Sequence, residues 1–352
     1  MVTRSSPSTR RVLDRLERLY ELGGGRGANR VGGSAAEREA CELAAEWMAA
    51  AELEVTHDSF GNVIGRLSGS RPDLPAVWSG SHVDSVPEGG KYDGALGVLA
   101  AIEAVAAAGQ GERTLGVVAF RDEERGCIGS LELVSHAVLP GSYVELHVEQ
   151  GPVLEAAGVP LGVVTGIVGS TRCEVLFTGS AAHAGTTPMA ERNDALVAAA
   201  EYVLRVRAAA ERIDGAVATV GRLEVGPGAT NVVPGTVRVT VDARAPDEAR
   251  LLLLLNELGL EPSVDLAPVE LDGSIRRILR EEIERAGLPA VELPSGAGHD
   301  AGVLAAAGVP AGMLFVRSLN GGVSHSPDEL TSEEDIALAI EVLTATLRRL
   351  AL

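Results

Sequence analysis

The sequence predicts an α/β protein in which a smaller domain is inserted into a larger one. Strand-like and helix-like segments alternate first, the pattern changes near residue 168, and the first pattern resumes after residue 272. Such alternation places helices on the faces of a sheet. A length of 352 residues suits two domains. We therefore expect residues 1–167 and 273–352 to form the larger domain and residues 168–272 the insert.

The larger domain is expected to begin with two helices. Residues 11–22 repeat apolar side chains at helical spacing, and a glycine-rich break follows at 23–33. Ser34 and Glu37 have the spacing of a capping box, which predicts a helix that ends near Ala51. Apolar runs then predict strands at 54–58, 62–67, 76–81, 115–121, 143–148 and 312–316. Periodic stretches predict helices at 94–108, 274–286 and 332–350.

The insert has a different order of elements. The pattern predicts strand 173–178, helix 190–210, strands 216–225 and 236–243, helix 246–258 and an extended piece at 264–269. This β-α-β-β-α-β order is that of the split-βαβ, ferredoxin-like unit.

The composition excludes several classes of partner. A formal net charge of −19 argues against nucleic acid and anionic membranes, because phosphate binding needs a basic surface. The apolar stretches are too short to span a bilayer, and we expect no signal peptide. Cys41, Cys127 and Cys173 are an odd, scattered set, which indicates reduced thiols and therefore a cytoplasmic protein.

Five of the seven histidines lie in turn-like segments rich in Gly, Asp or Glu. His82 ends an apolar strand, where open α/β sheets place ligand sites, and Asp84 lies close enough to orient its imidazole. Asp93 begins the alanine-rich helix, where a carboxylate can bridge two cations. Taken alone, His82 is more simply a buried strand-end histidine and Asp93 an N-cap.

Two further segments add acidic side chains and imidazoles. Glu123 and Glu124 follow a buried strand, and because neighbours point in different directions, one can ligate a metal while the other takes a proton from water. Alone, they are more commonly a solvated acidic turn. His147 shares one face of its strand with Glu145, because the two are separated by a single residue. His325 follows strand 312–316. Together these residues suit zinc, and also manganese or cobalt.

Six motifs make the sequence recognisable. They are GSHVDSV (80–86), GGKYDGALGV (89–98), ELHVEQGPVLE (145–155), HAGTTPM (183–189), SGAGHDA (295–301) and SHSPDE (324–329). These segments closely resemble the zinc-dependent N-carbamoyl-L-amino acid hydrolase and allantoate amidohydrolase family, a branch of the co-catalytic-zinc aminoacylases and carboxypeptidases. The resemblance covers residues 61–330 and keeps the order of the motifs.

The resemblance implies a zinc-aminopeptidase-like catalytic domain with an inserted lid and dimerisation domain. It implies two divalent ions, one held by His82, Asp93 and His147 and the other by Asp93, Glu124 and His325. Asp93 would bridge the ions, and Glu123 would be the general base that acts on the attacking water.

The resemblance also implies substrate contacts. The histidine that matches His183 reaches a partner subunit's active site and polarises the substrate carbonyl, which implies a homodimer through the lid. Asn231 and Arg244 would bind the substrate carboxylate, and Gln150 would lie near the ureido group. Without the motif match, His183, Asn231 and Arg244 are simply loop, turn and surface residues. His299 and Asp300 would support the site without ligating a metal.

The leading hypothesis is hydrolysis of the ureido bond of an N-carbamoyl-L-amino acid, releasing ammonia and carbon dioxide. Allantoate is the second candidate substrate, and an ordinary amide, as in aminoacylases and dipeptidases, is the third. A non-catalytic metal-binding scaffold is disfavoured, because it would not need Glu123. A compact loop at 125–130, a shortened part of the insert at 246–272 and a brief N-terminal region depart from the family pattern and leave the substrate side chain open.

Overall fold

The computed structural model describes residues 7–136, 138–261, 264 and 266–352. It divides the chain into two compact units, which are described separately. The first unit comprises Met1–Gly166 and Glu270–Leu352, and the second comprises Ile167–Val269.

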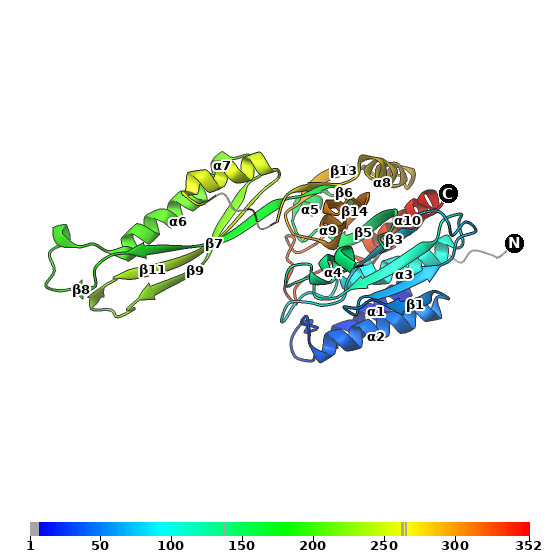
Figure 1. The fold of residues 1–352 in the computed structure, drawn as a ribbon, viewed down its shortest axis with the longest axis horizontal. Coiled ribbons are helices and arrows are strands. Elements are labelled where there is room, and N and C mark those ends of the chain that lie inside the picture. Colours follow the sequence, from blue (N-terminus) through cyan, green and yellow to red (C-terminus); the bar gives the residue numbers. More distant parts are fainter. Residues whose placement is uncertain (1–6, 137, 262–263, 265) are drawn as a thin grey trace. The chain divides into compact units, whose positions relative to one another are not determined.

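A nine-stranded sheet forms the centre of the first unit (Figure 1). Its strands are β1 (Glu54–His57), β2 (Val63–Leu67), β3 (Val77–His82), β4 (Leu115–Phe120), β5 (Ser142–Val148), β6 (Leu161–Ile167), β12 (Val269–Glu270), β13 (Val291–Ser295) and β14 (Ala311–Val316). Their order is β1-β2-β4-β3-β5-β14-β6-β12, with β13 paired to β6. Strands β4, β3, β5 and β14 are mutually parallel. Their carboxyl ends therefore share one edge of the sheet, where open α/β sheets bind ligands.

Helices cover both faces of this sheet. They are α1 (Thr9–Tyr20), α2 (Ala35–Ala50), α3 (Ala95–Ala108), α4 (Ile128–His136), α5 (Val153–Ala157), α8 (Gly273–Arg285), α9 (Asp300–Ala306) and α10 (Glu333–Leu350). Helix α3 is apolar on nearly all sides because it is enclosed by the sheet, α1 and α10 (Figure 1). Leu146 and Val148 of β5 belong to this core, whereas Glu145 contacts the start of α9. The alternation of β5 thus presents Glu145 and His147 to the opposite face.

An ion cluster around one buried carboxylate joins α1 to α3. Glu103, only 3% exposed, accepts hydrogen bonds from Arg11 Nε and Nη2 at 2.8 Å each and from Arg15 Nη1 at 3.1 Å. Because a carboxylate inside an apolar helix needs partners, these arginines account for the one acidic residue of α3.

The second unit is a three-stranded antiparallel sheet with two helices on one face. Its elements are β7 (Gly169–Thr178), α6 (Ala195–Arg212), β9 (Val217–Gly226), β11 (Thr236–Ala245) and α7 (Glu248–Leu258), and the strand order is β7-β11-β9. The short strands β8 (Ala182–His183) and β10 (Val232–Val233) pair with each other. The expected piece at 264–269 lies partly outside the described residues. Within them it adds one isolated bridge, Ser170 to Leu266, in place of a full fourth strand.

Membrane spans and disulfides are both absent from the described residues. No helix in the described part of the chain is long and apolar enough to cross a membrane. Cys41, Cys127 and Cys173 all lie in described segments, and none of them forms a disulfide.

Candidate metal centre

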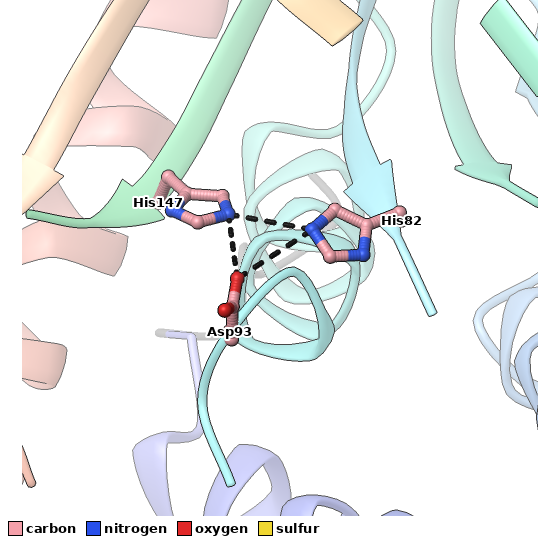
Figure 2. Close-up of side chains that lie close together, drawn as sticks. All are labelled: His82, Asp93 and His147. Atoms are coloured by element: carbon pink, nitrogen blue, oxygen red, sulfur yellow. Dashed lines mark hydrogen bonds and ion pairs between the residues drawn. The ribbon is translucent and has the colours of Figure 1, made fainter. Parts of the chain in front are cut away.

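The predicted metal ligands lie together at the carboxyl edge of the parallel strands. His82 is the last residue of β3, Glu124 follows β4, and His147 is the penultimate residue of β5. Asp93 precedes α3, and His325 lies in the loop after β14. Figure 2 shows the side chains of His82, Asp93 and His147 pointing toward one another from two strands and a helix start.

The first candidate group is His82, Asp93 and His147, each at most 2% exposed. His147 Nε2 lies 3.2 Å from Asp93 Oδ1, and His82 Nε2 lies 3.6 Å from the same oxygen (Figure 2). The two Nε2 atoms are 3.5 Å apart. Tetrahedral ligands bound about 2.1 Å from zinc lie about 3.4 Å from one another. The donor atoms therefore have the spacing of a zinc ligand shell.

The second candidate group is Asp93, Glu124 and His325. His325 Nε2 lies 3.4 Å from Asp93 Oδ2 and 3.4 Å from Glu124 Oε2. The imidazole is half exposed, at 52%. Asp93 thus presents one carboxylate oxygen to each group, which is the arrangement a bridging ligand needs.

The charges of the site also suit cations. Burial by itself would lower the pKa of His82, but Glu123, Asp84 and Asp93 raise it well above the ordinary value. Burial would raise the pKa of Asp93, but His147 and His82 hold it well below the ordinary value. The carboxylates around these imidazoles therefore favour a positive charge at this place. The imidazole and carboxylate donors are also those that zinc, manganese and cobalt accept.

Asp84 lies where the sequence predicted a supporting carboxylate. It is fully buried and accepts hydrogen bonds from the backbone N–H groups of Glu123, at 3.0 Å, and Glu124, at 3.2 Å. Its Oδ1 also lies 3.4 Å from His82 Nδ1. One side chain thus fixes the backbone of the acidic pair and faces the rear of the imidazole.

Glu123 lies beside the first group. Its Oε2 is 3.7 Å from His82 Nε2, and its side chain is 10% exposed. Burial raises the pKa of Glu123 well above its ordinary value, and the charges of Asp300 and Glu124 add to the rise. A carboxylate with a raised pKa is a stronger base than an ordinary one, which helps it to accept a proton from water.

His299 and Asp300 lie behind His147. The His147 and His299 rings are 4.6 Å apart, and His299 Nε2 is 2.8 Å from Ser295 Oγ. Burial and the neighbouring His147 hold the pKa of His299 far below its ordinary value, so this ring stays neutral. Burial and Glu145 raise the pKa of Asp300 to about 8.

Glu145, His147 and His299 form a third group with metal-ligand spacing. However, Glu145 already accepts hydrogen bonds from Ser81 Oγ at 2.7 Å and Ala301 N at 2.8 Å. His147 Nδ1 is 2.9 Å from the carbonyl of Val148, and its Nε2 faces Asp93. The carboxylate and one imidazole are therefore already engaged, which makes this group less suited to hold an ion than the first.

Gln150 lies at the candidate metal centre, where its side chain contacts Asp93, a predicted ligand. Its Nε2 donates to Asp93 Oδ2 at 2.9 Å and to Ser324 Oγ at 3.2 Å. Ser324 in turn donates to Glu329 Oε2 at 2.8 Å. Sequence reasoning assigns no role to Ser324 or Glu329, although both lie in the SHSPDE motif. An acidic residue in a motif that also carries a ligand was the available signal.

The substrate-binding candidates of the second unit form two separate groups. His183 and Asn231 are exposed neighbours, because His183 pairs with Val232 and Ala184 N donates to Asn231 O at 2.9 Å. Arg244 lies near the far end of β11, with Asp242 accepting from its Nε at 2.8 Å. At about 3.4 Å per residue, the strand between Thr236 and Arg244 spans roughly 27 Å. One chain therefore does not bring the two groups together.

Comparison with known proteins identifies the family. The model of Peptidase family M20/M25/M40 matches residues 78–349, most of the chain. The chain belongs to this family. This match and the relatives described below confirm the predicted relationship to the carbamoylase and allantoate amidohydrolase branch, the fold class, and the prediction of a hydrolase that acts on amide-type C–N bonds.

Three relatives illustrate the similarity. An N-carbamoyl-L-amino acid amidohydrolase of Geobacillus stearothermophilus is 38% identical, with 97% of this chain and 98% of that protein covered. A probable allantoate deiminase of Oryza sativa subsp. japonica is 36% identical, with 92% and 84% covered. The crystal structure of an amidase of the hydantoinase/carbamoylase family from Burkholderia multivorans is 32% identical, has a TM-score of 0.87 and covers 98% of each chain.

Proposed function

We propose that this enzyme hydrolyses the ureido C–N bond of N-carbamoyl-L-amino acids with two divalent ions, most simply zinc. The observation that carries the proposal is Asp93, whose two oxygens face two separate groups of donors. The relative from Geobacillus stearothermophilus supports the substrate class, because it is named an N-carbamoyl-L-amino acid amidohydrolase and aligns with this chain over nearly its whole length. The relative from Oryza sativa makes allantoate the second candidate.

The residues of the site would divide the chemistry. His82 and His147 would hold one ion, Glu124 and His325 the other, and Asp93 both. Bound ions of this kind polarise a carbonyl and lower the pKa of water. Glu123 would accept the proton of the attacking water and return it to the leaving nitrogen, because its raised pKa suits both transfers.

We further propose that two copies of the chain complete each site. A small substrate cannot span the roughly 27 Å of β11 from Thr236, at the end that follows the His183–Asn231 pair, to Arg244 within one unit. In our proposal, Arg244 binds the substrate carboxylate and His183 of a second copy donates to the substrate carbonyl. A guanidinium is suited to bidentate carboxylate binding. The enzyme would then be a homodimer, and we place it in the cytoplasm, where cysteines outside disulfides stay reduced.

A substrate panel tests the reaction. Zinc-, manganese- or cobalt-loaded protein is incubated with N-carbamoyl-L-amino acids, allantoate, N-acetyl-amino acids and dipeptides, and ammonia and free amine are both measured. Ammonia with free amino acid from the carbamoyl compounds supports the proposal. Ammonia from allantoate alone supports the second candidate, and free amine without ammonia contradicts a ureido substrate. Glu123→Gln should keep its metal and lose activity by about 100-fold or more.

Mixing two inactive variants tests the composite site. Glu123→Gln lacks the proposed base, and His183→Ala lacks the proposed carbonyl donor. If each site uses residues of two copies, mixed dimers contain one site with both groups, and activity returns on mixing. Sedimentation should show a dimer for each variant. A monomer, or a dimer that shows no recovery after subunit exchange, contradicts the composite site.

A further inference from the structure

Glu329 is a buried carboxylate for which the proposed reaction has no role. It is 5% exposed and follows His325 in the loop after β14. Its Oε1 accepts hydrogen bonds from the backbone N–H groups of Tyr92, at 2.7 Å, and Asp93, at 3.0 Å. Buried carboxylates are costly unless they are paired in this way. Glu329 therefore fixes the backbone from which the bridging carboxylate of Asp93 extends.

The second oxygen of Glu329 holds the other ligand-bearing segment. Glu329 Oε2 accepts the hydroxyl of Ser324 at 2.8 Å, and Ser324 directly precedes His325. Gln150 closes the network, because its Nε2 donates to Ser324 Oγ and to Asp93 Oδ2. One carboxylate thus joins the loop of Asp93 to the loop of His325, two segments that lie more than 200 residues apart in the sequence.

Gly90 provides the space for this carboxylate. A Cβ at position 90 would lie 2.2–2.3 Å from the carboxyl carbon and both oxygens of Glu329. These are closer approaches than real side chains make, and the three nearest atoms all belong to Glu329. The backbone of Gly90 is not in the left-handed region, so its conformation is open to alanine. The main obstacle to alanine at position 90 is therefore the steric clash of its Cβ with the Glu329 carboxylate.

We propose that Glu329 is a positioning residue that holds Asp93 and His325 at the spacing needed for the second metal ion. The inference rests on the proposed metal-dependent function of the same site. Hydrogen-bond partners that orient metal ligands typically affect metal affinity by about 10- to 100-fold. The tight contact at Gly90 adds a second way to disturb the same carboxylate without removing it.

Binding of Co²⁺ alone to metal-free protein tests the proposal, with dissociation constants from chelator competition and the visible spectrum of the bound ion. Glu329→Ala and Gly90→Ala should each weaken binding of one ion by about 10- to 100-fold and alter its spectrum. Glu329→Gln keeps an acceptor for the backbone N–H groups and should recover part of the affinity. Asp328→Asn, an exposed neighbour in the same loop, should bind as the wild type does.

The double variant separates this role from general loss of packing. Once the Glu329 carboxylate is gone, alanine at position 90 has space, so Gly90→Ala should add less than about threefold to the effect of Glu329→Ala. The proposal is overturned if the effects of the two changes on Co²⁺ affinity are fully additive. It is also overturned if Glu329→Ala, Gly90→Ala and Glu329→Gln all bind Co²⁺ as the wild type does. Because no substrate is present, failure of the ureido assay with normal Co²⁺ binding would count against the proposed function only.

Discussion

Replacing Asp84 by asparagine probes how the site is held together. The Asp84 carboxylate accepts two backbone N–H groups, those of Glu123 and Glu124, and faces His82 Nδ1. An asparagine side chain has one acceptor oxygen, so one buried N–H group loses its partner. Such a loss costs about 1–3 kcal/mol. If the loss destabilises the active arrangement of the site by that amount, kcat/KM falls roughly 5- to 150-fold.

The assay compares kcat/KM and Zn²⁺ affinity in wild type, Asp84→Asn and a control. Asp73→Asn is a suitable control because Asp73 has a carboxylate that is 70% exposed. We expect both quantities to fall in Asp84→Asn and neither to change in the control. Wild-type kcat/KM and Zn²⁺ affinity in Asp84→Asn would refute the idea that this carboxylate orients His82 and the acidic pair.

Three further predictions follow from buried groups. Arg30 is fully buried and donates to the carbonyls of Val83 at 2.7 Å and Leu19 at 3.0 Å. Arg30→Met should therefore lower the free energy of unfolding, measured in urea, by about 2–4 kcal/mol. An unchanged urea midpoint would contradict this. Burial raises the pKa of Asp300 from 3.8 to about 8, so the folded metal-free protein binds this proton more tightly than the unfolded chain, and its stability should fall as pH rises from about 4 to 8. Asp300→Asn should flatten that slope in thermal melts, and an equal slope would exclude Asp300 as its source. Gly94 has φ +60°, and a Cβ there would lie 2.3–2.4 Å from the His82 ring. Gly94→Ala should therefore abolish tight Zn²⁺ binding in a calorimetric titration. Wild-type affinity would show that His82 can shift without loss of Zn²⁺ binding.

The strands and the clustering of candidate ligands near the sequence motifs were predictable for a physical reason. Buried parallel strands are largely continuous apolar runs, and polar residues at or just after their carboxyl ends mark the ligand edge of the sheet. His82, Glu124 and His147 have that pattern, and the structure brings them to one edge of the sheet. Helix α3 was equally clear, because an alanine-rich run admits few alternatives.

Other features depended on contacts between distant segments. Composition indicates only a break at the glycine-rich stretch 23–33, yet Ala28 pairs with Gly89, and Arg30 donates to the carbonyl of Val83, next to His82 of the candidate metal centre. Strand β6 was not predicted, because its pairing with β14 is not visible in local periodicity. The role of Glu329 likewise depends on an approach to Tyr92 and Asp93 that no spacing in the sequence reveals.

The separation of the substrate-binding candidates was also beyond the sequence. Motif order suggests that Asn231 and Arg244, only 13 residues apart, act on the same carboxylate. Strand β11 (Thr236–Ala245) lies between them in the sequence, and Arg244 is near the end of that strand farthest from Asn231. A short distance along the chain is therefore a long distance in space whenever the intervening residues form a strand.

Metal stoichiometry tests the central claim most directly. Metal-free wild type and His325→Ala are titrated with Zn²⁺, and bound metal is measured after removal of the excess. We predict two tightly bound ions in the wild type and one in His325→Ala, because His82, Asp93 and His147 remain intact in the variant. Ureido hydrolysis should appear only after the second ion binds. A wild type that binds one ion and is fully active would contradict the two-ion account.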